Sequence, residues 1–90
     1  MNLRQYNKER DNAIIELVKT GSLEEWYKVA RKYGMVSPKN EMILKAGLYK
    51  AAQVCVNIPK EIKEKAAEEC RALGMNPYTL GGKEENDGTN

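Results

Sequence analysis

The sequence contains no histidine, so the side chains to consider for chemistry are two cysteines and a set of carboxylates. Without histidine the commonest general base is missing, and neither a Ser-His nor a Cys-His pair can form. The glutamates between Glu61 and Glu69 are interspersed with lysines, a pattern typical of a solvated helix face and not of paired catalytic acids. The sequence therefore predicts a protein that is not an enzyme and has no cofactor.

The two cysteines predict buried thiols and no metal site. Cys55 and Cys70 are too few for a disulfide scaffold, and they lack the CxxC spacing of a metal-binding pair. They fall near opposite ends of two successive predicted helices, about 10 Å apart along the helix axes at 1.5 Å per residue, too far for a disulfide. We therefore expect two free cysteines.

The location expected from the sequence is cytoplasmic. No basic start followed by an apolar run marks a secretory signal. No stretch approaches the roughly 18 apolar residues that a membrane span requires. We expect neither a membrane partner nor a small-molecule substrate.

The spacing of apolar residues predicts four helices and no strand. Residues at intervals of three and four form stripes over about 3–20, 23–33, 38–56 and 59–73. Gly21 and Gly34 are placed to end the first two helices, and Pro59 must follow the end of the third. Trp26 lies on the apolar stripe of its helix, so we expect it in the core, whereas Arg10 should extend from its stripe to a carboxylate.

The helix at 38–56 is the longest, and we expect the others to pack around it. Ser37 and Pro38 predict its start, with Ser as the cap and Pro at the first helical position. Gly47 should lie in the centre of its packing face, where the missing Cβ would let a neighbouring helix approach. The predicted core face comprises Ile43, Leu44, Gly47, Leu48, Ala51, Val54 and Cys55, and the predicted solvent face comprises Glu41, Lys45, Lys50 and Gln53.

The fold class expected is all-α, a compact single-domain bundle of four helices. Ninety residues suit one small core. We expect a helical domain over 1–80 and a flexible polar tail over 81–90, because that tail has no apolar residue with which to offset the entropy of ordering.

Basic residues are concentrated in the middle of the chain. The total charge is +2, which neither requires nor excludes a nucleic-acid partner. Between Trp26 and Val56, however, six lysines and arginines face a single glutamate, so this segment carries +5.

Part of the same segment, from Val29 to Pro38, has Ala30 within a helix, Gly34 in a turn, an apolar Met35 and then Ser37 before a second helix. This order resembles the helix-turn-helix DNA-binding domains over residues 26–48, with a turn one residue longer than the family's pattern. The resemblance implies that the helix beginning at Pro38 is the recognition helix and that the partner is DNA. The nucleic-acid-binding residues expected are Arg31, Lys32, Lys39, Asn40, Lys45, Tyr49, Lys50 and Gln53.

The same helix supports a second interpretation, in which it binds protein. Apolar and amphipathic residues are interleaved with its lysines, as in a helix-face interface with another protein or with a second copy in a homodimer. Such a module would be an adaptor, a small subunit or a protein inhibitor of the kind that phages and mobile elements encode. Its interface residues would be Met42, Ala46, Tyr49, Ala52 and Val56.

Both functions remain open at this point. The coincidence of the basic segment with the helix-turn-helix-like stretch places DNA binding first. If folding scatters the basic residues over several faces, protein binding takes its place.

Overall fold

The computed structural model describes residues 3–78 and confirms the all-α fold. The helices are α1 (Leu3–Thr20), α2 (Glu24–Tyr33), α3 (Glu41–Val54) and α4 (Lys60–Ala72), and the described residues contain no strand. All four predicted helices are present. The flexible tail predicted at 81–90 lies outside the described residues.

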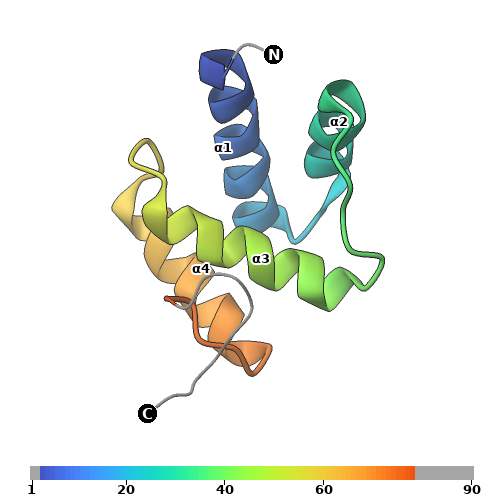
Figure 1. Ribbon diagram of the computed structural model, residues 1–90. Coiled ribbons are helices and arrows are strands. Elements are labelled where there is room, and N and C mark those ends of the chain that lie inside the picture. The colour runs from blue at the N-terminus through green and yellow to red at the C-terminus, as the bar shows by residue number, and fades with distance from the viewer. Residues whose placement is uncertain (1–2, 79–90) are drawn as a thin grey trace, which may run out of the picture.

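The four helices form two pairs that meet through α1 and α3. In Figure 1, α1 and α2 stand side by side, α3 crosses near their ends, and α4 lies on the other side of α3. The closest pairs are α3 with α4 and α1 with α2, and α1 also touches α3 and α4. The backbones of α2 and α3 do not approach each other, although the two helices are consecutive in the chain.

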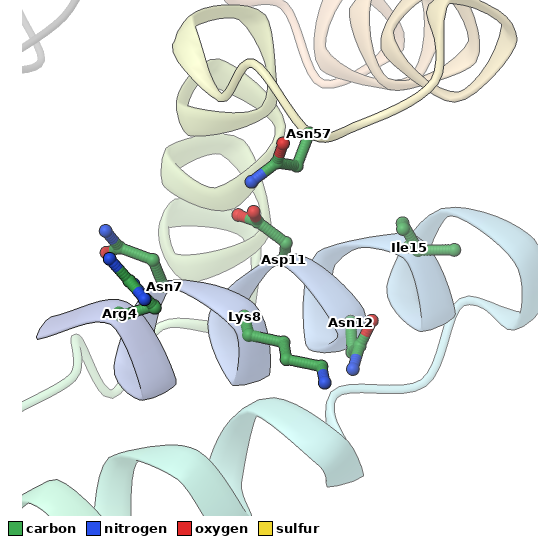
Figure 2. A pocket seen from close by; sticks show the side chains of 7 residues that line it. All are labelled: Arg4, Asn7, Lys8, Asp11, Asn12, Ile15 and Asn57. Carbon is green, nitrogen blue, oxygen red and sulfur yellow. The ribbon is translucent and has the colours of Figure 1, made fainter. Parts of the chain in front are cut away.

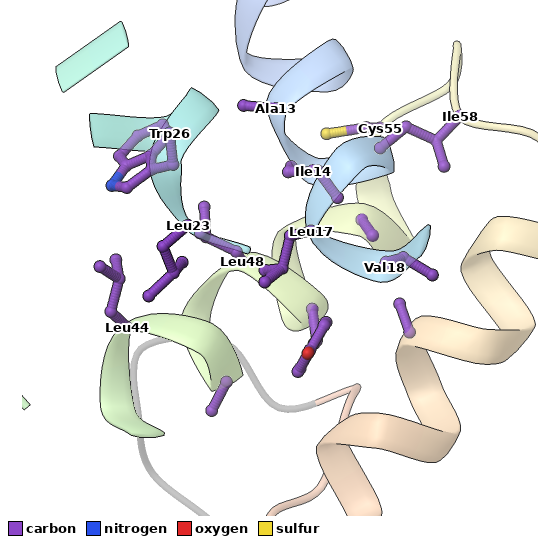
Figure 3. Close-up of a cluster of buried hydrophobic side chains, with 14 of the residues drawn as sticks. Ala13, Ile14, Leu17, Val18, Leu23, Trp26, Leu44, Leu48, Cys55 and Ile58 are labelled. Carbon is purple, nitrogen blue, oxygen red and sulfur yellow. The ribbon is translucent and has the colours of Figure 1, made fainter. Parts of the chain in front are cut away.

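The core lies where the two pairs meet. Ile14 and Leu17 on α1 are completely buried at its centre, and Trp26 is buried on α2, as predicted. Figure 3 shows Leu44 and Leu48 of α3 in the same buried cluster as Leu23 and Leu17. Each helix thus contributes an apolar stripe, as the periodicity predicts.

Gly34 ends α2 in the left-handed conformation that the sequence predicts. Its φ is 66°, and the amide of Met35 donates to the carbonyl of Ala30 at 2.8 Å, which closes the last turn. This conformation is strained for residues with a Cβ, so glycine is the favoured residue here.

The predicted start of α3 is wrong by three residues. Asn40 is the cap: its Oδ1 accepts hydrogen bonds from the amides of Met42 and Ile43, at 2.9 and 3.2 Å. The hydroxyl of Ser37 instead accepts from the indole N–H of Trp26 at 3.0 Å. A Ser-Pro pair and an Asn can each begin a helix. The buried indole needs a hydrogen-bond acceptor, and Ser37 supplies it.

The predicted core face of α3 is right in part and wrong in part, since Leu44, Leu48 and Cys55 are buried as predicted but other members of that face are exposed. Ile43 and Val54, expected in the core, are 50% and 61% exposed, and a Cβ on Gly47 would meet nothing within 4 Å. Lys50, expected in solvent, is only 5% exposed. The cause is that α3 is covered by α4 on one side and by α1 on another, so more than half of its circumference is buried.

The predicted states of the cysteines and of Arg10 are confirmed. Cys55 and Cys70 are free and buried. The guanidinium of Arg10 pairs with the carboxylate of Asp11, at 3.0 Å between Nη2 and Oδ1. Among residues 3–78 no helix could cross a membrane, and no cluster of three or more metal-ligating side chains occurs.

Candidate interaction site

The residues expected to bind nucleic acid do not form one surface. Tyr49 and Lys50 are buried, and Gln53 and Lys45 are partly buried. The covering element on the Tyr49 side is α4: the side-chain amide of Gln53 donates to the carbonyl of Lys63 at 3.0 Å. Burial, with Glu69 and Cys70 of α4 nearby, also raises the pKa of Tyr49. The expectation that these residues face a ligand is wrong for Tyr49 and Lys50.

Of the remaining basic residues of the set, Arg31 and Lys32 lie in the last turn of α2, and Lys39 lies just before α3. Arg31 and Lys39 are exposed, and neither forms an ion pair with another described residue. Lys32 is also exposed, but its Nζ lies 2.8 Å from a carboxylate oxygen of Glu9 on α1. Asn40, expected to contact base edges, uses its carbonyl oxygen as the cap of α3.

The arrangement of α2 and α3 differs from that of a helix-turn-helix pair. A seven-residue connection, 34–40, joins them, and the backbone of α2 lies close to that of α1 and not to that of α3, although α2 and α3 share the core. A recognition helix is normally held by the helix that precedes it, through a turn of three or four residues. The nucleic-acid interface implied by the resemblance is therefore not assembled by this pairing of helices.

The residues expected at a protein interface are divided between surface and core. Met42 and Val56 are exposed, but Ala46, Tyr49 and Ala52 are buried. The three buried residues lie on sides of α3 that other helices cover. As one surface, this predicted set is wrong.

A different apolar surface of α3 is exposed. Ile43, Gly47, Ala51 and Val54 follow one another at intervals of four, four and three residues, so they share one side of the helix. We call these four residues the α3 stripe. Ile43, Gly47 and Val54 are exposed and Ala51 is partly exposed. Gly47 and Ala51 make the centre of the stripe flat, with a larger side chain at each end.

Exposed apolar residues also occur before and after α3 in the sequence. Six of the eight exposed large apolar residues among 3–78 fall between Met35 and Val56, so they are concentrated around one helix. Val36 precedes the helix and is 97% exposed, and Val56 follows it. The sequence of α3 already indicated exposed apolar residues, because the helix has too few polar residues to cover a whole solvent-facing side. Which side would remain uncovered depended on the placement of α1 and α4.

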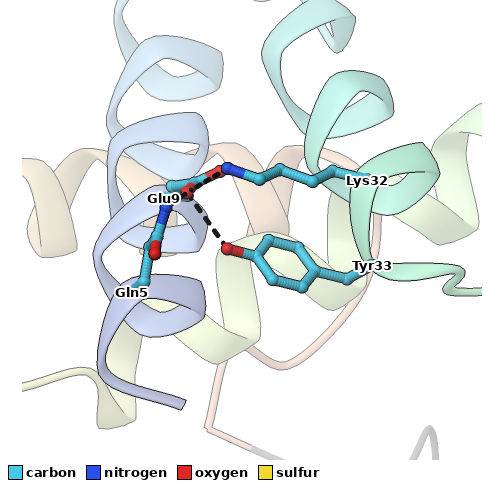
Figure 4. A network of polar contacts seen from close by, with 4 residues as sticks. All are labelled: Gln5, Glu9, Lys32 and Tyr33. Carbon is cyan, nitrogen blue, oxygen red and sulfur yellow. Dashed lines mark hydrogen bonds and ion pairs between the residues drawn. The ribbon is translucent and has the colours of Figure 1, made fainter. Parts of the chain in front are cut away.

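A polar cluster joins α1 to α2 and is structural in character. Figure 4 shows Glu9 as the acceptor for Lys32 and Tyr33, at 2.8 and 3.0 Å, and Gln5 donates to it at 3.0 Å. The hydrogen bond from Lys32 is the main cause that lowers the pKa of Glu9, and the same bond raises the pKa of Lys32. The cluster therefore keeps Glu9 ionised, which suits a link between helices and not a general acid.

The thiol of Cys55 is poorly suited to act as a nucleophile. It is buried, and burial raises its pKa. The thiolate is the reactive form, and a raised pKa reduces its population at neutral pH. Cys55 thus behaves as a small core residue.

Searches against protein-family models, curated proteins and solved structures found no match to this chain.

Proposed function

We propose that this protein acts without catalysis, by binding another protein through the α3 stripe. The observation that carries the proposal is the row formed by Ile43, Gly47, Ala51 and Val54, which stays uncovered although α3 is buried where it faces α1 and α4. Contiguous exposed apolar surface of this kind marks interaction sites more often than isolated apolar residues do.

The shape of the stripe favours a helix as the partner's contacting element. The small residues Gly47 and Ala51 allow a second helix to approach to about 8 Å between axes, the lower end of the range for packed helices. Ile43 and Val54 would then flank the contact. Covering the area that remains exposed on each of them contributes on the order of 1 kcal/mol at about 25 cal/mol per Å².

Site-specific photo-crosslinking in the native cell tests this function. A photoreactive amino acid at Val54 is expected to give a discrete crosslinked species, whereas the same residue at Glu64, exposed on α4, should not. Adding Ile43→Glu to the Val54 probe should abolish the product while leaving the helical content unchanged, because Ile43 is half exposed. Equal crosslinking at Val54 and Glu64 would contradict the proposal.

Light scattering on the purified protein determines whether the partner is a second copy. A dimer that dissociates on Ile43→Glu identifies the stripe as a homodimer interface. A monomer, together with a crosslinked species of unequal mass, indicates a different protein.

DNA binding ranks second, because Tyr49 and Lys50 are buried and Lys32 is paired with Glu9. Exposed Arg31 and Lys39 are the observations that still favour it. The test is binding to random-sequence duplex DNA at two salt concentrations. Micromolar binding that weakens steeply with salt and is reduced by Arg31→Ala and Lys39→Ala would restore it to first place.

A further inference from the structure

A cavity of about 420 Å³ lies against α1, away from the α3 stripe. Five of its lining residues, Arg4, Asn7, Lys8, Asp11 and Asn12, come from one side of α1, and Asn57 comes from the connection between α3 and α4. Figure 2 shows the side chains of Asn57 and Asp11 pointing toward each other. The volume falls within the range of about 300–1,000 Å³ that small-ligand sites occupy.

The inner wall of the cavity is a buried carboxylate. Asp11 is only 5% exposed, and its Oδ1 accepts from Nε and Nη2 of Arg10, at 3.2 and 3.0 Å. The guanidinium of Arg10 thus lies beside the buried carboxylate and balances its formal charge. The carboxylate points toward Asn57 and also interacts with the thiol of Cys55. Because a carboxylate has about four acceptor positions, it can still accept from a hydroxyl donor of a ligand.

The rim of the cavity carries two positive charges without a counter-charge. Arg4 and Lys8 are exposed one turn apart on α1, and neither forms an ion pair within the part of the chain that the structure describes. Since the charge of Arg10 balances that of Asp11, the charges of Arg4 and Lys8 give the cavity a formal net charge of about +2. Arginine and lysine are the residues that hold phosphate and carboxylate groups.

Three carboxamides complete the polar lining. The side chains of Asn7, Asn12 and Asn57 make no hydrogen bond to any other described residue, although each has two donors and an acceptor. Ile15 adds one apolar wall. Carboxamides beside a carboxylate match a ligand with several hydroxyl groups, because each hydroxyl both donates and accepts.

We propose that this cavity binds a small organic anion that carries neighbouring hydroxyl groups, the chemistry shared by sugar phosphates and nucleotides. The anionic group would bind to Arg4 and Lys8, and the hydroxyls would bind to the carboxamides and Asp11. The proposal is for binding alone, and no chemical step is assigned to the lining residues. This site is separate from the α3 stripe and does not depend on the function proposed for it.

The test is a titration of the full ¹⁵N-labelled chain with ribose 5-phosphate at constant ionic strength, followed by NMR. We expect saturable shifts of the side-chain amide signals of Asn7, Asn12 and Asn57. Arg4→Ala with Lys8→Ala should weaken binding by at least about tenfold, since two charge-assisted hydrogen bonds are lost. The matched control is Lys60→Ala with Lys65→Ala on α4, which removes the same charge from exposed positions outside the cavity and should leave the affinity unchanged.

Several outcomes would overturn the proposal. These are shifts that do not saturate, shifts absent from the three asparagines, or an equal loss of affinity in the control variant. Inorganic phosphate that binds as tightly as ribose 5-phosphate would remove the role given to the hydroxyl-binding groups and overturn it as well. Adenosine monophosphate distinguishes the two ligand sources: tighter binding than ribose 5-phosphate supports a nucleotide, and weaker binding supports a sugar phosphate.

Discussion

The two helix pairs of this protein are held together by different kinds of contact. Polar and aromatic groups extend between α1 and α2: the rings of Tyr6 and Tyr33 meet edge to face with centroids 5.3 Å apart, and Glu9 links the helices beside them. In the pair of α3 and α4, the most deeply buried residues are small ones: Ala46, Ala52, Ala66, Ala67 and Cys70.

This difference predicts different sensitivities to mutation. Small side chains allow close approach of helices, so an added methyl group in the α3 and α4 pair has no space to occupy. Polar contacts at the edge of the α1 and α2 pair are partly solvated and are exchanged for contacts with water. The pair of α3 and α4 should therefore respond to changes in side-chain volume, and the pair of α1 and α2 to changes in charge and pH.

The largest effect is expected from Ala66→Leu. Ala66 is completely buried on α4, so a leucine there overpacks the core and should lower the free energy of unfolding by about 2–3 kcal/mol. Ala72→Leu is the control, because Ala72 is exposed on the same helix and its substitution should change stability by less than about 0.5 kcal/mol. Urea unfolding followed by circular dichroism measures both. Equal stabilities of the two variants would mean that this pair is not closely packed.

A smaller effect of opposite sign is expected from Gly47→Ala. Gly47 lies within α3, and an added Cβ meets nothing within 4 Å, so alanine should raise the free energy of unfolding by about 0.4–1 kcal/mol. Opposite effects of Gly47→Ala and Ala66→Leu on stability would distinguish the uncovered side of α3 from the covered side of α4. Thermal unfolding measures the gain. A destabilised Gly47→Ala variant would indicate that another element covers this position.

The smallest effect is expected from Glu9→Gln, and it should depend on pH. The folded pKa of Glu9 is lowered below its ordinary value of 4.5, chiefly by the hydrogen bond from Lys32. A lowered folded pKa gives stability that is present above the unfolded pKa and is lost as the pH falls through the folded value. The wild type should therefore exceed Glu9→Gln in unfolding midpoint near pH 7, and the difference should disappear at pH values below 4.5.

Glu16→Gln serves as the control for that experiment. It removes a carboxylate from the same helix that has no side-chain partner among residues 3–78. If both variants show the same pH dependence, the effect comes from net charge and not from the link between α1 and α2.

The sequence determined the helices because helix formation depends on neighbours three and four residues away. The bounds of α1 agree with the prediction, and α2 and α4 agree to within a residue. Trp26 in the core and the two buried free thiols also follow from local spacing. These features required no knowledge of which helix packs on which.

Only the tertiary structure decided which sides of α3 are buried. An apolar stripe predicts one covered side, but α3 receives α4 on one side and α1 on another. The closure of α4 buried Tyr49 and left Ile43, Gly47 and Val54 exposed. The exposure of the α3 stripe depends on which sides of α3 are covered by α1 and α4, and the cavity depends on the position of Asn57 beside α1. Local spacing alone does not predict either feature.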